Sequence, residues 1–263
     1  MQANWYRCNM KKILSILLLL PLSVMMMAEE ENWMSPDRPG MATGTDVMPF
    51  KKVMWETGFE GDWDGSSHVV TLPTTMFRFG ITPFAELRVE YDGTLQQNGK
   101  QWDYAPEPLV LGTKVRVFDG SDQYKWIPKT SLMVNLEIPC TKQMASTMHV
   151  APSVYALFSN DVTDWFNIGY NVGAEWDGTS AIPATFLAVC LGFNITDDLG
   201  AFVESYNYFT KYGIGNTAAD PNIDFGFNWM VHQKVQLDVY AGFSCMNPKN
   251  FSMVGLGVAW LIN

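Results

Sequence analysis

Residues 165–176 read Trp-Phe-Asn-Ile-Gly-Tyr-Asn-Val-Gly-Ala-Glu-Trp, and this stretch decides the fold class. Successive side chains of a strand point to opposite faces. One face is apolar and carries Phe166, Ile168, Tyr170, Val172, Ala174 and Trp176. The other face carries mainly small and polar residues. In a soluble sandwich a second sheet would cover the apolar face, whereas in a membrane β-barrel lipid covers it and the polar face lines the lumen.

The spacing of the aromatic residues matches the thickness of an outer membrane. Phe166 and Trp176 are ten residues apart, which is about 33 Å of strand at roughly 3.3 Å per residue. A tilt near 40° reduces this to about 25 Å, the height of the apolar band of an outer-membrane barrel. We therefore predict an all-β fold, a transmembrane antiparallel β-barrel.

Period-two segments recur along the chain and set the size of this barrel at about twelve strands. They are residues 53–60, 69–81, 85–91, 109–118, 130–138, 150–159, 165–176, 185–194, 199–209, 222–231, 235–244 and 251–262. Alternate connections are tight and the others are longer, above all 92–108 and 211–221, which is typical of periplasmic turns and outer loops. The connection 119–129 is an exception, since it is long on the side of the tight turns. In the sixth segment, Val154 and Tyr155 are both candidates for the lipid face.

The N-terminus predicts secretion. Arg7, Lys11 and Lys12 precede an apolar run that ends at Ala28, the pattern of a cleaved signal peptide. We therefore divide the chain into a signal peptide (1–28), an N-terminal extension (29–50) and an outer-membrane β-barrel (51–263).

Composition excludes several other classes of protein. Removing residues 1–28 takes three basic residues and no acidic ones, so the net charge changes from −10 to −13, which disfavours nucleic-acid partners. After residue 28 no stretch approaches 18 consecutive apolar residues, so we expect no transmembrane helix. We expect Cys140, Cys190 and Cys245 to be free thiols.

Short motifs from residue 36 to the end resemble one outer-membrane family. They are Asp37-Arg38-Pro39-Gly40, Val47 to Pro49, Trp55-Glu56-Thr57-Gly58-Phe59, Phe77-Arg78-Phe79-Gly80-Ile81-Thr82, Ala85-Glu86-Leu87-Arg88, Leu111-Gly112-Thr113-Lys114, Phe202-Val203-Glu204 and Val235-Gln236-Leu237-Asp238. In this order they are similar to the family named for the meta-pathway of phenol degradation. The resemblance implies an outer-membrane barrel often called a transporter, whose link to aromatic compounds comes from pathway context.

One departure from the family concerns assembly. Such barrels usually end on an aromatic residue, whereas this chain ends Trp260-Leu261-Ile262-Asn263. The expected partners are outer-membrane lipids, the barrel-insertion machinery and an unidentified small solute. The departure puts recognition by the insertion machinery in question.

Charged residues at inward positions form the candidate site. They are Glu56, Glu60, Arg78, Glu86, Arg88, Glu90, Lys114, Arg116, Glu137, Glu175, Glu204, Asp224 and Asp238. One wall is mixed but leans basic and the opposite wall is acidic. The structural interpretation is a salt-bridge network in which Glu86 and Glu90 neutralise the basic residues. The functional interpretation is an electric field across the pore that orients solutes as they pass. On this interpretation we expect Arg88→Ala to lower the stability little and to shift ion selectivity toward cations.

The extension 29–50 is rich in Met, Pro and Gly and shows no strand alternation. It is either a disordered periplasmic leader or a plug, because side chains alone do not always fill a lumen of twelve strands. We favour the plug, with Asp37, Arg38, Pro39 and Gly40 as its motif.

We expect no metal, no cofactor and no catalytic residue. His68, His149 and His232 are scattered, without carboxylates or cysteines at the spacing of metal ligands. His149 and Ser153 invite comparison with outer-membrane phospholipases, but no Asn is placed to orient the imidazole. A lipid hydrolase is thus the least favoured function.

Two classes of function remain. The favoured one is passive transport of small, hydrophobic or aromatic solutes, and the alternative is a closed barrel that serves as a structural anchor. Aromatic residues near the expected outer rim would form an apolar entrance patch for such solutes. They are Tyr91, Trp102, Tyr104, Tyr206 and Tyr208.

Overall fold

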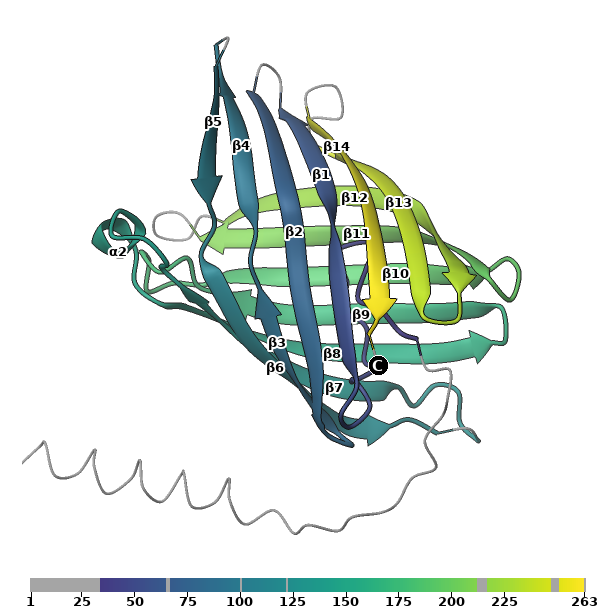
Figure 1. Cartoon of the computed structure of the whole chain (residues 1–263). Coiled ribbons are helices and arrows are strands. Elements are labelled where there is room, and N and C mark those ends of the chain that lie inside the picture. The colour runs from purple at the N-terminus through teal and green to yellow at the C-terminus, as the bar shows by residue number, and fades with distance from the viewer. Residues whose placement is uncertain are drawn as a thin grey trace, which may run out of the picture. The chain divides into compact units, whose positions relative to one another are not determined.

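The structure, a computed structural model, describes residues 34–64, 67–99, 101–121, 123–211, 217–246 and 251–262. These residues form mainly β-strands (Figure 1). The strands are β1 (Val53–Asp64), β2 (Ser67–Thr82), β3 (Ala85–Glu90), β4 (Gly93–Asn98), β5 (Gln101–Pro106), β6 (Leu109–Asp119), β7 (Lys129–Ile138), β8 (Ala151–Thr163), β9 (Phe166–Glu175), β10 (Ala184–Asn194), β11 (Leu199–Lys211), β12 (Thr217–His232), β13 (Val235–Ser244) and β14 (Phe251–Leu261). A short helix, α2 (Met144–Thr147), lies between β7 and β8. The predicted signal peptide and residues 29–33 lie outside the described residues.

Twelve of these strands close into an antiparallel barrel, which confirms the predicted fold. β1 pairs with both β2 and β14, and the ring continues through β3 and then β6 to β13. The remaining two strands, β4 and β5, form a hairpin that pairs with β2 at Val69–Thr71. The hairpin projects at the end opposite the C-terminus (Figure 1). Treating residues 92–108 as a simple loop was therefore wrong.

The barrel is polar inside and apolar outside. In β3, Glu86 and Arg88 are buried whereas Leu87 between them is exposed, and in β12 Asp224 is buried whereas Phe225 is exposed. Apolar surface in water is unfavourable by about 25 cal/mol per Å², so this outer surface is suited to lipid. No helix within the described ranges is long and apolar enough to cross a membrane.

The structure settles which way Val154 and Tyr155 face in β8, the strand that the sequence left ambiguous. The Tyr155 hydroxyl donates a hydrogen bond to Glu175 at 2.8 Å, so Tyr155 points into the lumen, and Val154 is exposed on the lipid side. Cys140, Cys190 and Cys245 are free thiols, as predicted.

Candidate functional site

Residues 34–50, called the N-terminal segment below, are bound by inward-facing side chains from several strands. On β11, Glu204 accepts hydrogen bonds from the backbone N–H groups of residues 41–42 at 3.0 Å. On β9, the Asn171 amide accepts from the N–H of Thr43 at 2.8 Å and donates to its carbonyl at 3.1 Å. The Asn171 side chain thus satisfies both backbone groups of one residue, as a neighbouring strand would.

The other side of the barrel holds the later residues of the same segment. Glu86 on β3 accepts a hydrogen bond from the backbone N–H of Met48 at 2.6 Å. On β7, the Ser131 hydroxyl donates to the carbonyl of Thr45 at 2.6 Å. Since β3, β7, β9 and β11 lie at different places around the ring, the N-terminal segment lies across the barrel interior.

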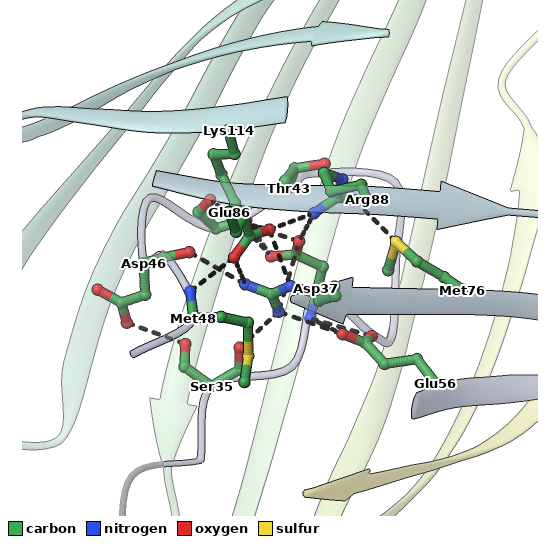
Figure 2. A network of polar contacts seen from close by, with 12 residues as sticks. Ser35, Asp37, Thr43, Asp46, Met48, Glu56, Met76, Glu86, Arg88 and Lys114 are labelled. Carbon is green, nitrogen blue, oxygen red and sulfur yellow. Dashed lines mark hydrogen bonds and ion pairs between the residues drawn. The ribbon is translucent and has the colours of Figure 1, made fainter. Parts of the chain in front are cut away.

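A dense ion network joins this segment to β1, β2, β3 and β6 (Figure 2). We call it the inner ion cluster, and its members are Asp37, Glu56, Arg78, Glu86, Arg88 and Lys114. It contains three basic and three acidic side chains, so its formal charge is balanced.

Asp37 of the segment contacts all three cations of the cluster. The Lys114 ammonium lies 2.9 Å from both of its carboxylate oxygens, Arg78 lies 3.6 Å away, and Arg88 donates a short hydrogen bond to it. Glu86 binds Arg78 through two hydrogen bonds of 3.0 and 2.9 Å. Such paired, bidentate contacts are the strong kind of charged hydrogen bond.

The cluster is dry. Arg78, Glu86 and Lys114 are 0% exposed and Arg88 is 7% exposed. The expectation of water-screened pairs, from which we inferred that Arg88→Ala costs little, is therefore wrong for these residues. Removing one partner of a buried pair leaves an uncompensated charge, at about 3–5 kcal/mol.

The pKa of Asp37, which lies outside the spanning strands, follows from this environment. Burial alone raises the pKa of a carboxyl, but the positive charges of Arg78, Lys114 and Arg88 lower it by more. The net result is a pKa of Asp37 below its usual value of 3.8. Asp37 is thus held as an anion between three cations.

Arg38 extends the same segment to the acidic wall. Its guanidinium binds the Asp238 carboxylate on β13 through two hydrogen bonds of 3.2 Å and lies 6.0 Å from the centre of the Tyr240 ring. It also donates to Thr74 on β2 at 3.0 Å. Asp37 and Arg38, adjacent in sequence, therefore join β2, β3 and β6 to β13.

The remaining acidic residues of β1 and β9–β12 lack basic partners among the described side chains. Glu60 accepts a hydrogen bond from the hydroxyl of Tyr240, and Glu175 accepts one from Tyr155. Asp224 is 0% exposed, and neither of its carboxylate oxygens has a hydrogen-bond partner in the described structure.

An apolar cluster fills the lumen beside this acidic wall. Its buried members are Phe186, Ala188, Phe202, Tyr206, Tyr240 and Met253, and Ala42, Tyr155, Cys190 and Tyr208 pack against them. Placing Tyr206 and Tyr208 in an outer entrance patch was therefore wrong. Tyr91, Trp102 and Tyr104 are exposed, as a rim position requires.

Three further predicted site residues belong neither to the inner ion cluster nor to the acidic wall of β1 and β9–β13. Arg116 pairs with Asp119 at 2.9 Å near the end of β6, where its side chain is 28% exposed. Its predicted neutralisation by Glu86 and Glu90 is wrong. Glu90 and Glu137 are half-buried and form no ion pair with any residue of the described ranges.

Pro39 and Gly40 contribute backbone rather than charge. Gly40 has φ +94°, a conformation that favours glycine, and a Cβ there would lie 3.1 Å from Glu204 Oε2. The segment therefore turns closely against β11 at this point.

The uncharged partners of the segment were not predicted from the sequence. Asn171, Ser131 and Gln236 all bind its backbone. Each is a polar residue at an inward position of its strand, and this is the sequence feature that could have identified it.

The described residues offer no group of three or more His, Cys, Asp and Glu that could hold a metal ion. Within the same residues, Ser153 is buried in β8 and has no hydrogen bond to His149, whose backbone N–H binds the carbonyl of Gly178 at 2.8 Å.

Residues 36–261 match the family described as "Putative MetA-pathway of phenol degradation". The chain belongs to this family. Its fold is that of outer-membrane β-barrels. The COG4313 outer membrane channel from Pseudomonas putida F1 is similar, with a TM-score of 0.63 and 9% identity over 83% of this chain and 98% of the channel. A KdgM porin solved with disordered oligogalacturonate has a TM-score of 0.50 and 10% identity, over 79% of this chain and 99% of the porin. No curated protein sequence matches the chain significantly.

Proposed function

We propose that this family member is an outer-membrane barrel for passive transport of small solutes, in which the N-terminal segment acts as a plug. The observation that carries the proposal is that strands on opposite sides of the ring bind the segment, through Glu204 on β11 and Glu86 on β3. The outer-membrane fold and the family support the transport class.

The contacts of the segment are mostly polar, and this favours a plug that can be displaced. Water can replace hydrogen bonds and ion pairs once a lumen hydrates, and a hydrated pair is worth only about 0–1 kcal/mol. The same pairs hold the segment firmly while the lumen stays dry. Hydration therefore separates a closed state from an open one.

The wall is also shaped around the segment. A Cβ at Gly80 of β2 would lie 1.8 Å from the carbonyl oxygen of Pro49, and one at Gly257 of β14 would lie 2.2 Å from Arg38 Nε. These glycines leave the space that the segment occupies. We infer that the plug binds at one defined position in the barrel.

The chemical class of the transported solute is suggested by the side chains that line the lumen. The lumenal aromatic side chains Phe186, Phe202, Tyr206 and Tyr240 would contact a small aromatic solute moving past the segment. Together with the phenol-pathway family, they support aromatic compounds as cargo. Lipids of the outer membrane and the insertion machinery are the proposed partners.

The rival function, a closed structural barrel, has one observation in its favour. Arg78, Lys114 and Glu86 are completely buried, as in a permanently filled lumen. No solute would pass such a barrel whether or not the segment were present.

Conductance in planar bilayers tests the proposal. We expect discrete current steps from the full mature chain and larger, longer steps from a variant that lacks residues 29–50. A variant that refolds, as judged by a heat-dependent gel shift, and yet shows no current would favour the closed barrel.

A further inference from the structure

The two sides of the lumen differ in charge balance. The inner ion cluster is neutral, whereas β1 and β9–β13 bring several carboxylates inward, among which Asp238 is paired with Arg38. From residue 151 to residue 261 the basic residues of the sequence are Lys211, Lys234 and Lys249. Lys211 is the last residue of β11, and Lys234 lies in the turn before β13. The strands from β8 to β14 therefore supply the acidic wall with no cation at mid-strand.

Asp224 is the point where this imbalance is greatest. Its carboxylate is fully buried, and neither oxygen has a hydrogen-bond partner among the described residues. Glu204 lies directly opposite in the β11–β12 register, and Glu60 adds further negative charge nearby. A buried charge is unfavourable unless it is paired, so a cation placed here would pair with a carboxylate that no described protein group already binds.

Arg38 shows how the same wall holds a cation. It binds the Asp238 carboxylate and lies over the face of Tyr240. A carboxylate combined with an aromatic face is a general arrangement for binding organic cations. Around Asp224 the corresponding residues are Glu204, opposite it in the β11–β12 register, and Tyr206, two residues further along β11.

We propose that Asp224, together with Glu204 and Tyr206, binds a small organic cation, an ammonium or guanidinium group carried on an apolar or aromatic body. This inference deepens the proposed transport function and rests on it, because the cation would be a solute in transit. The carboxylates pair with its charge and the aromatic cluster contacts its apolar part.

The surroundings favour an organic cation over a metal ion. Calcium takes six to eight oxygen ligands, and the described residues contain no cluster of three His, Cys, Asp or Glu with metal-binding geometry. The neighbours of Asp224 include Met253, whose thioether accepts a weak hydrogen bond from the Tyr206 hydroxyl at 3.5 Å.

Met253 is also the side chain that a ligand would displace. At Gly242, opposite Asp224 on β13, an added Cβ would lie 2.8 Å from the Cβ of Asp224 and 2.9 Å from the terminal methyl of Met253. Methionine is flexible and fills irregular gaps. Its movement would open space beside the carboxylate without moving a strand.

Binding to three probes of one shape tests this site. Benzylammonium, benzyl alcohol and benzoate differ in charge but hardly in size. Isothermal titration of the full mature chain in detergent should show binding of benzylammonium and weaker binding of the other two. Asp224→Asn should lower benzylammonium affinity by about tenfold to a hundredfold, as expected for loss of a charged hydrogen bond.

The matched control is Asp220→Asn, which makes the same change at an exposed position of the same strand. It should leave benzylammonium affinity unchanged. Equal affinity of the Asp224→Asn variant, or equal binding of all three probes, would overturn the inference. A second variant, Met253→Ala, should bind benzylammonium more tightly, and weaker binding there would also count against the site.

Flux into proteoliposomes separates this inference from the proposed function. If all three probes enter equally, transport stands and the cation site is wrong. If no probe enters although benzylammonium binds at Asp224, the site stands and the transport function is wrong.

Discussion

At the scale of single residues, burial decides what a charged side chain contributes. Arg88 is buried and contacts Asp37 and Glu86, whereas Arg116 is more exposed and pairs with Asp119 near a strand end. We predict that Arg88→Ala lowers the free energy of unfolding by roughly 3–5 kcal/mol. Arg116→Ala should lower it by about 0–1 kcal/mol. Urea unfolding in detergent measures both, and equal losses would show that the cluster is hydrated.

Asp37 should make stability depend on pH. Its pKa is lowered in the folded protein, because the nearby cations outweigh the effect of burial. A lowered folded pKa adds stability above the unfolded value of 3.8, and that stability is lost as the pH falls through the folded pKa. We predict that unfolding free energy falls below about pH 5 and that Asp37→Asn flattens this fall. An unchanged slope in the variant would remove Asp37 as the cause.

At the scale of elements, the alternation of side chains was enough to predict the twelve barrel strands. It failed for β4 because its sequence, GTLQQN, shows no continuous apolar face, and for β5 because QWDYAP is only six residues long, too short for its Trp102 and Tyr104 to mark a strand. A hairpin that projects beyond the barrel has no lipid to face on either side (Figure 1), so lipid does not impose a period-two pattern on it.

The lumen was predictable in part. Inward positions follow from the strand period, so the sequence identified Arg78, Glu86, Arg88 and Lys114 as lumenal. Their pairing depends on Asp37, whose position is set by the path of a segment without secondary structure. No periodic pattern specifies such a path. For the same reason the contacts of Asn171 with Thr43 could not be predicted.

Substitution of glycines in the barrel wall tests whether the N-terminal segment binds at one defined position. Gly80→Ala would place a Cβ 1.8 Å from the carbonyl oxygen of Pro49. We therefore predict that the free energy of unfolding falls by about 1–3 kcal/mol, as expected for an overpacked site. Hydrogen exchange should also become faster at Met48, whose N–H is bound by Glu86. The control is Gly169→Ala on β9, where the nearest atom would be 3.9 Å away. If both variants have the same free energy of unfolding and the same hydrogen exchange at Met48, the segment has no defined binding position at β2.

At the scale of the whole molecule, the protein is a lipid-facing barrel whose interior is filled partly by its own N-terminal segment. The segment is held by polar contacts from several strands, and the inner ion cluster and Arg38 fix it on two sides. Transport then requires that the segment move while the barrel wall stays closed. The central claim is therefore about mobility of the segment.

A reversible disulfide measures this claim most directly. The Asn171 side chain binds both backbone groups of Thr43, so a disulfide between cysteines at these positions would tether the segment to β9, and thiol titration checks that the bond has formed. The background replaces Cys140, Cys190 and Cys245 with alanine. In planar bilayers we predict no current steps from the oxidised double-cysteine protein and steps comparable with those of the cysteine-free parent after reduction by dithiothreitol. Identical currents before and after reduction would contradict the claim that the N-terminal segment is a movable plug.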